Sequence, residues 1–146
     1  MRRLRPVLIL AFVAGPDCAN ASASDRLPGP MPAVVERVID GDTIEVRAAI
    51  WLDQEIKVAV RIDGVDAPEL FRPRCPAEKA AGERARDFVE SFFADRRASL
   101  SGISHDKYAG RVLASVRNAA GADLAAALLS SGNARNYGTS DWCLSS

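Results

Sequence analysis

The sequence predicts an α+β domain that consists mainly of β-strands, with one long helix and one short helix near the C-terminal end. Three observations predict this class. β-Branched and alternating segments fill residues 33–63 and recur in residues 98–117, a long amphipathic segment separates them, and a short apolar helix follows. At 146 residues, 48% of them hydrophobic and 26% charged, the chain has the size and composition of one globular domain. This composition excludes a disordered chain and a protein with several membrane spans.

The first residues have the composition of a secretory signal peptide. Three arginines precede the apolar run Val7–Val13, and small residues around position 21 provide a cleavage site. We expect residues 1–21 to be removed; cleavage after residue 23 and an uncleaved amphipathic start are the alternatives. The apolar run is too short to anchor the chain in a bilayer. The mature protein is therefore expected to be exported, periplasmic or secreted, monomeric and free of the membrane.

The charge balance restricts how the mature chain binds a polyanion. The whole chain has 19 basic and 19 acidic residues, and residues 1–21 contain three of the former and one of the latter, which leaves 16 and 18 and a net charge of −2. A protein that binds nucleic acid through phosphate neutralisation alone is expected to be basic. Either the partner is not nucleic acid, or a bound cation and a few placed arginines supply the positive field locally.

Two cysteines remain after the signal peptide, Cys75 and Cys143. An even pair in an oxidising compartment predicts a disulfide, with two free thiols as the alternative. The bond would close a loop of about 69 residues and stabilise the fold by roughly 4 kcal/mol. It would also join the C-terminal tail to the segment that follows the acidic residues described below.

The first half of the domain reads as three strands. Residues 24–32 hold three prolines and are expected to be a linker to the domain at residues 33–146. Residues 33–40 are β-branched and predict a strand, which ends at Gly41. Residues 43–47 alternate between apolar and polar side chains, as a half-buried strand does.

The third strand, residues 54–63, alternates most regularly. Its apolar face holds Ile56, Val58, Val60 and Ile62, which places Arg61 on the opposite face near the strand end. Trp51 lies in the hairpin before this strand, and we expect it to pack as a cap and not to bind a ligand.

A long helix is predicted over residues 76–97, with Pro76 in the first helical position. Its apolar residues recur at three- and four-residue spacing, so its phenylalanines are expected in the core. Two short strands over residues 98–105 and 111–117 and a short helix over residues 123–130 follow. Three strands, a helix, two strands and a helix form the order of the five-stranded Greek-key barrel known as the OB-fold.

Two acidic clusters flank the hairpin, one at residues 40–43 and one at residues 63–69. Because the first and last residues of an antiparallel hairpin lie together, Asp42 and Asp66 are expected to meet at one end of the barrel. Two close carboxylates repel each other unless a cation lies between them, and hard oxygen ligands favour Ca²⁺ or Mg²⁺. The backbone carbonyl of Ala67 is a candidate ligand, and Glu69 can point at the same ion.

Three motifs in this order resemble the thermonuclease (micrococcal nuclease) family. They are I-D-G-D-T, which contains Asp42; R-I-D-G-V-D-A-P-E, which begins at Arg61; and D-K-Y-A-G-R, which ends at Arg111. The similarity extends from residue 33 to residue 132. It implies an OB-fold nuclease that uses Ca²⁺, with Mg²⁺ as the alternative ion, cuts DNA or RNA that is single-stranded or frayed, and leaves 3′-phosphate and 5′-hydroxyl ends.

The resemblance also implies roles for individual residues. Asp42, Asp66 and the carbonyl of Ala67 match the Ca²⁺ ligands, and Glu69 matches the carboxylate that positions or deprotonates the attacking water. The remaining matches are Arg61 and Arg111 on the scissile phosphate, Lys107 and Tyr108 on a terminal phosphate, Ile62 and Leu113 beside the base, and, in a looser match, Tyr137 against the base.

The chain departs from the family pattern in four ways. Ala109 is inserted before the glycine of the third motif, the hairpin is longer, the last helix of the prototype is missing, and the domain is slightly acidic. The insertion leaves the direction of Tyr108 open. The acidic charge predicts weaker affinity for long polymers and a shallower salt dependence.

Two other functions are compatible with parts of the sequence. A non-catalytic OB-fold module that binds an oligonucleotide, an oligosaccharide or a protein agrees with the near-neutral charge, but it does not need the arginines and carboxylates together. Nuclease classes that use a histidine would depend on His105, the one histidine of the chain, which lies in no recognisable motif. Ca²⁺-dependent cleavage of denatured DNA separates the first alternative from a nuclease.

Overall fold

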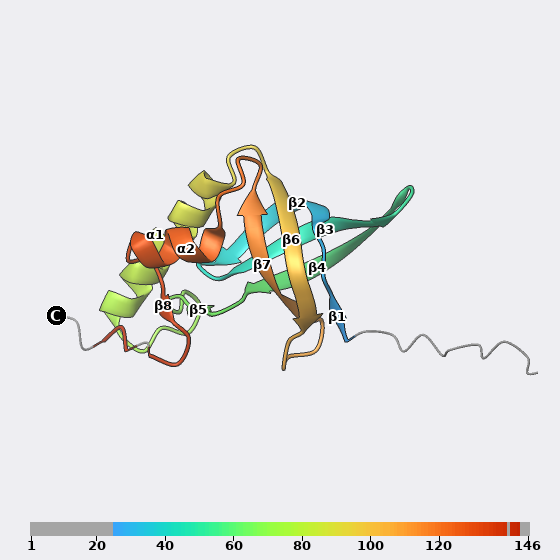
Figure 1. Ribbon diagram of the computed structural model, residues 1–146. Helices are drawn as coiled ribbons and strands as arrows, with labels where there is room; N and C mark the ends of the chain where they lie inside the picture. Colours follow the sequence, from blue (N-terminus) through green and yellow to red (C-terminus); the bar gives the residue numbers. More distant parts are fainter. Residues whose placement is uncertain (1–24, 140, 144–146) are drawn as a thin grey trace, which may run out of the picture.

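The computed structural model describes residues 25–139 and 141–143 (Figure 1). The predicted signal peptide, residues 1–21, lies outside the described residues. Within the described ranges, none of the helices has the length and apolar character that crossing a membrane requires. The elements, in chain order, are β1 (Arg26–Leu27), β2 (Met31–Asp40), β3 (Thr43–Trp51), β4 (Gln54–Ile62), β5 (Val65–Asp66), α1 (Pro76–Phe92), β6 (Arg97–His105), β7 (Arg111–Asn118), α2 (Leu124–Ser130) and β8 (Arg135–Asn136).

Five strands close into a barrel. β2 pairs with β3, β3 with β4, β4 with β7, β7 with β6, and β6 with β2, so that the described strands of the barrel leave no free edge. The β4–β7 pair is parallel and the others are antiparallel. This mainly β architecture with two helices confirms the predicted α+β OB-fold.

The core lies inside the barrel and under the two helices. The inward faces of the strands contribute fully buried aliphatic side chains, among them Ile44, Val46, Val60 and Leu100. Figure 1 shows both helices on one side of the barrel, where α1 buries Val89 and α2 buries Leu124 and Leu128, among others. The alternation of apolar residues in the strands and their three- and four-residue spacing in the helices therefore both indicate which side chains lie in the core.

Helix α1 ends at Phe92, five residues before the predicted end. Phe93 is 3% exposed and belongs to the core, and the backbone N–H of Arg96 donates to the Phe93 carbonyl at 2.8 Å. Arg96 has φ +58°, a left-handed conformation that stops a helix and turns the chain into β6. The predicted helix over residues 76–97 was too long because hydrophobic spacing does not reveal this turn.

Two expectations for the first half of the chain differ from the structure. Arg26–Leu27 pair with β6 and β2 begins at Met31, so the segment expected as a linker contributes to the sheet. Trp51 is 75% exposed and caps nothing, because the β3–β4 hairpin extends well beyond the barrel (Figure 1). Ile56, on the same hairpin, is exposed for the same reason.

The predicted disulfide between Cys75 and Cys143 is present. Cys75 is also the N-cap of α1, where its sulfur accepts from the backbone N–H of Glu78. A second tie between the same segments is the ion pair of Arg74 with Asp141. The tail of the described chain is thus fastened to the start of α1.

Candidate active site

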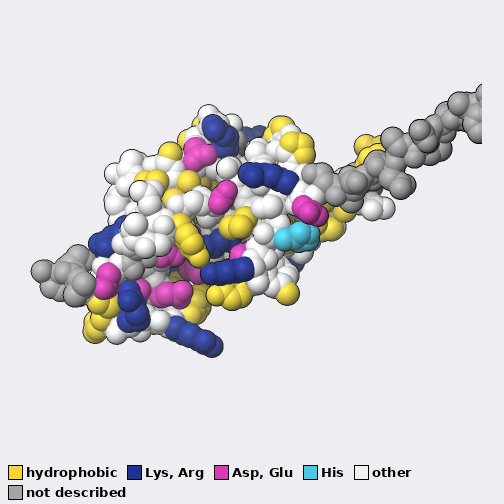
Figure 2. All heavy atoms as spheres, turned by 60° about the horizontal axis from the view of Figure 1, so that its bottom comes forward, with side chains coloured by type: hydrophobic (Ala, Val, Ile, Leu, Met, Phe, Trp, Pro, Cys, Tyr) yellow, Lys and Arg dark blue, Asp and Glu magenta, His cyan; other side chains and the backbone are white. Residues whose placement is uncertain are grey.

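One pocket of about 540 Å³ gathers most of the residues that the sequence singled out. It lies between the ends of β4 and β7, the β6–β7 turn and the short β5–β8 pair. Figure 2 turns the lower face of Figure 1 toward the reader, and acidic and basic side chains are interspersed there. The pocket is lined by Asp40, Arg61, Ile62, Asp63, Gly64, Val65, Asp66, Glu69, Asp106, Lys107, Tyr108, Arg111, Leu113 and Tyr137.

Asp42, at the turn between β2 and β3, is a buried carboxylate with several donors. It is 2% exposed, and its Oδ2 accepts from the backbone N–H of Ala67 at 2.6 Å. Its Oδ1 accepts from the hydroxyl of Thr43 at 3.1 Å and forms an ion pair with Arg61. Burial, followed by repulsion from Asp40, raises the pKa of Asp42 to about 7. The ion pair with Arg61 and the hydrogen bond from Ala67 therefore do not offset the cost of burying the Asp42 charge beside Asp40.

Arg61 lies between the two predicted metal-binding carboxylates. Its Nη1 contacts Asp42, and its Nη2 donates to Asp66 Oδ1 at 2.9 Å. The guanidinium therefore joins the two acidic clusters across the end of the hairpin. Asp42 and Asp66 meet at one end of the barrel, as the antiparallel hairpin predicts.

Arg111, the first residue of β7, lies on the same face as Arg61. In the parallel β4–β7 ladder Ala59 is opposite Arg111 and Arg61 is opposite Leu113, and a two-residue offset keeps both arginines on one side. Arg111 forms an ion pair with Asp106 at 2.6 Å and lies over the ring of Tyr108. Although burial opposes it, the hydrogen bond and charge of Arg111 lower the pKa of Asp106. This carboxylate therefore holds the guanidinium in place.

Glu69 lies at the start of the loop that connects β5 to α1. Burial, followed by the negative charges of Asp40 and Glu78, raises its pKa above that of an ordinary glutamate. A raised pKa improves a carboxylate as a proton acceptor near neutral pH. Among the described residues, Glu69 has no ion-pair partner, so it can contact water or a substrate.

One lysine, Lys107, and two tyrosines form the outer rim of the pocket. Lys107 Nζ donates to the hydroxyl of Tyr137 at 3.1 Å and lies 5.1 Å from the ring centre of Tyr108. Tyr108 therefore lines the pocket despite the inserted Ala109, which settles the direction left open by the insertion. Ile62 and Leu113 were both expected to contact a base. Ile62 is only 1% exposed, whereas Leu113 is partly exposed, so Leu113 offers the larger surface for such a contact.

The charges of the pocket favour a bound cation. The lining contains five carboxylates, from Asp40, Asp63, Asp66, Glu69 and Asp106, and three basic side chains, from Arg61, Lys107 and Arg111. A phosphodiester anion would be repelled by this excess of negative charge. In the described ranges no three His, Cys, Asp or Glu side chains are grouped around one metal position. The predicted set is compatible with this finding because it uses two carboxylates and one carbonyl, and water commonly completes the shell of Ca²⁺ or Mg²⁺.

Comparison with known proteins agrees with this geometry. The model of the family described as staphylococcal nuclease homologue matches residues 59–143, from β4 to the disulfide. The chain belongs to this family. The resemblance read from the three motifs is thereby confirmed.

A curated relative adds to the staphylococcal nuclease homologue match. An uncharacterized endonuclease of Escherichia coli is 28% identical over 116 residues. The aligned region covers 80% of this chain and 61% of that protein. The chain thus spans less than two thirds of the length of this relative.

Three residues that contact the candidate site were not among the predicted site residues. Thr43 donates to Asp42, the backbone N–H of Asp42 donates to Asp40 at 3.2 Å, and Asp106 holds Arg111. Asp106 begins the D-K-Y-A-G-R motif, so its position in the motif was a usable signal. Asp40 lies two residues before the predicted ligand and Thr43 directly after it, but their contacts depend on the shape of the turn.

Gly41 allows the acidic turn of the domain to approach α1. A Cβ atom at this position would lie 2.6 Å from the Cβ of Ala85 and 2.8 Å from the Cβ of Ala67. Gly41→Ala is therefore expected to destabilise the fold by about 1–3 kcal/mol, measured by urea unfolding, since overpacking costs this much. The double variant Gly41→Ala/Ala85→Gly should lose less than the sum of the single losses. Additive losses would show that the Ala85 contact is not the cause.

Proposed function

We propose that the protein is a Ca²⁺-dependent nuclease that hydrolyses phosphodiester bonds of DNA or RNA. One observation carries the proposal. Arg61 and Arg111, brought from adjacent strands to one face, share a pocket with Asp66 and Glu69, while the buried Asp42 forms an ion pair with Arg61. Two fork-shaped donors beside an acidic cluster suit a phosphodiester, whose negative charge grows during hydrolysis.

The cation would be held by Asp42, Asp66 and the carbonyl of Ala67. When bound, it supplies positive charge to a site whose carboxylates outnumber its basic groups. In the cation-bound protein Arg61 shares its carboxylate partners with the ion, and we expect its guanidinium to bind the substrate phosphate. The excess of carboxylates over basic side chains in the pocket supports Ca²⁺ or Mg²⁺ as a requirement.

The residues of this chain would divide the reaction among them. Glu69 accepts a proton from the attacking water, which its raised pKa favours. Arg61 and Arg111 bind the phosphate oxygens and stabilise the charge that develops on them. The expected products carry a 3′-phosphate and a 5′-hydroxyl.

The side chains at the rim of the pocket are suited to bind an unpaired nucleotide. Lys107 with Tyr108 would bind a terminal phosphate, and Tyr137 with Leu113 would contact the base. A base reaches such rings only when it is out of the helical stack, as in single-stranded or frayed nucleic acid. We therefore propose these forms of DNA or RNA as substrates.

Digestion of denatured DNA and of RNA in Ca²⁺, Mg²⁺ or chelator, followed by end-group analysis, tests the proposal. Cleavage that requires the cation and leaves 5′-hydroxyl ends is expected. Glu69→Gln keeps the shape of the side chain but removes the proton acceptor, so it is expected to lose activity and keep nucleic-acid binding. Binding without any cleavage by the unchanged protein would indicate the non-catalytic module instead. Cleavage in chelator, or normal cleavage by Glu69→Gln, would contradict the mechanism.

Export to the periplasm or the medium remains part of the proposal. A disulfide between Cys75 and Cys143 suits an oxidising compartment, where such bonds persist. Detection of the cleaved protein outside the cytoplasm, with its N-terminus determined by mass spectrometry, would test it.

A further inference from the structure

The loop from Pro68 to Cys75 runs from the pocket to the start of α1 and exposes an aromatic and a cationic side chain. Phe71 is 70% exposed. Arg72, its neighbour, is exposed and makes no hydrogen bond or ion pair with another described residue. Neither side chain contributes to the pocket lining or to the mechanism above.

The backbone of this loop is held on both sides. At Gly82 of α1 a Cβ atom would lie 3.0 Å from the carbonyl oxygen of Pro68 and 3.1 Å from that of Glu69, so the loop packs directly on the helix. The backbone N–H of Arg74 donates to buried Glu78 at 2.6 Å, and the next residue forms the disulfide. A fixed backbone presents the Phe71 ring to solvent without a large ordering cost on binding.

Arg72 differs from most exposed arginines of the described ranges because no carboxylate of those ranges is paired with it. Five exposed arginines have a carboxylate partner, namely Arg37, Arg47, Arg74, Arg97 and Arg117, whereas exposed Arg84 on α1 resembles Arg72 in having none among the described residues. Arg72 keeps its full charge available to an external anion. The loop thus offers an aromatic face and a guanidinium in consecutive residues.

We infer that Phe71 and Arg72 form a second nucleotide subsite, in which the ring stacks on a base and the guanidinium binds the adjoining backbone phosphate of a single strand. The inference rests on the proposed nuclease function. Phe71 lies two positions after Glu69 in the chain, so their Cα atoms are at most about 7 Å apart. A strand that leaves the pocket past Glu69 therefore meets this loop first.

The chemistry of the loop favours a nucleic-acid strand over a protein partner. Stacking on one aromatic ring beside one cation is sufficient to hold one nucleotide of a single strand. A stable protein interface needs about 800 Å² on each side, far more than two side chains provide. The subsite also supplies positive charge on a domain whose overall charge is slightly negative, and it does so outside the acidic pocket.

Kinetics with a long and a short substrate test the inference. The long substrate is an oligothymidylate of about 12 nucleotides, and the short one is the p-nitrophenyl ester of thymidine 5′-phosphate, which fills the pocket alone. Phe71→Ala is expected to raise KM for the oligonucleotide about ten-fold and to leave kcat and all constants for the ester unchanged. Phe71→Trp keeps an aromatic face and should restore the low KM.

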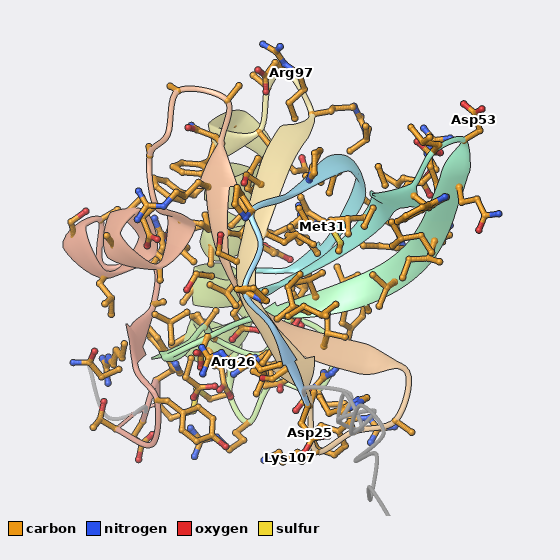
Figure 3. All side chains as sticks on the ribbon, turned by 45° about the vertical axis from the view of Figure 1, so that its right-hand side comes forward. Asp25, Arg26, Met31, Asp53, Arg97 and Lys107 are labelled. Carbon is orange, nitrogen blue, oxygen red and sulfur yellow. A yellow bond between two sulfur atoms is a disulfide. The ribbon has the colours of Figure 1, made fainter. Side chains whose placement is uncertain are left out.

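Arg72→Ala is expected to change the salt dependence. Loss of one phosphate contact on a single strand lowers the slope of log KM against log salt by about 0.7. Trp51→Ala is the matched control, because Trp51 is equally exposed but lies about 26 Å along β3 from Thr43. Figure 3 shows the hairpin tip at Asp53, at the upper right, far from the pocket rim at Lys107, at the bottom. Trp51→Ala should behave as the unchanged protein.

Binding of the same oligonucleotide in chelator, followed by fluorescence anisotropy, separates this inference from the proposed function. If the protein cuts nothing but Phe71→Ala weakens binding about ten-fold, the subsite stands and the nuclease proposal fails. If the unchanged protein cuts and Phe71→Ala and Arg72→Ala match Trp51→Ala on the oligonucleotide, the subsite is overturned. An equal loss on the ester also overturns it, because the loop would then act only through the position of Glu69.

Discussion

Replacing either Arg61 or Arg111 with alanine is expected to lower kcat roughly 10²–10³-fold, because each guanidinium supplies donors to the charge that develops on the phosphate. This loss corresponds to about 3–4 kcal/mol of transition-state stabilisation. Single-turnover cleavage of denatured DNA at saturating protein measures it without interference from binding. Near-normal turnover in both variants would exclude the proposed mechanism.

The Arg61→Ala and Arg111→Ala variants should differ in how much folding stability they lose. Arg111 contacts Asp106 at the rim, whereas Arg61 joins the buried Asp42 to Asp66. Without Arg61 these carboxylates repel each other, so Arg61→Ala should also lower the free energy of unfolding in chelator and regain stability when Ca²⁺ is added. Arg111→Ala should show a smaller dependence on Ca²⁺.

Lysine at position 111 provides the control for geometry. Arg111→Lys keeps the positive charge but not the planar fork, so it should recover only part of the rate lost in Arg111→Ala. Full recovery would mean that Arg111 acts through charge alone. Circular dichroism should show an unchanged fold in all these variants.

Removing the disulfide with Cys75→Ser/Cys143→Ser is expected to lower the free energy of unfolding by about 4 kcal/mol. The bond spans 68 residues, and in the chain-entropy model a loop of this length gives that value. For a domain of this size such a loss is a large part of the total stability. Urea unfolding of the variant and of the unchanged protein measures the difference.

Chemical reduction gives an independent control for the disulfide. The unchanged protein in reductant should unfold at the same urea concentration as the double serine variant, because both lack the same bond. A difference below about 1 kcal/mol in the free energy of unfolding between oxidised and reduced protein would contradict this prediction. It would show that the β5–β8 pairing and the Arg74–Asp141 ion pair hold the C-terminal segment without the disulfide. The serine variant would then be as stable as the oxidised protein.

The sequence predicted the fold and the meeting of the acidic clusters because both follow from local rules. Alternation with period two located β3 and β4, and an antiparallel hairpin necessarily brings its two ends together. Asp42 and Asp66 lie at those ends. Arg111 could be placed beside them only through the family motif, since the parallel β4–β7 pair joins segments about 50 residues apart.

The remaining features depend on contacts that no local pattern encodes. Ile56 alternates as regularly as Val60, yet it is exposed, because periodicity identifies the face of a strand and not whether anything covers that face. The position of Arg61 between two carboxylates depends on its side-chain conformation. Whether Arg72 has a carboxylate partner likewise depends on which side chains lie around it in the fold.

The pairing of β8 with β5 has a consequence for how the protein matures. Asp66 lies opposite Arg135 in this pair, and the segment that follows is fastened by Cys143. These residues leave the ribosome after every other described element. A nascent chain consequently lacks the β-strand partner of Asp66, and this side of the pocket is complete only after the C-terminal segment has been synthesised and has folded onto β5.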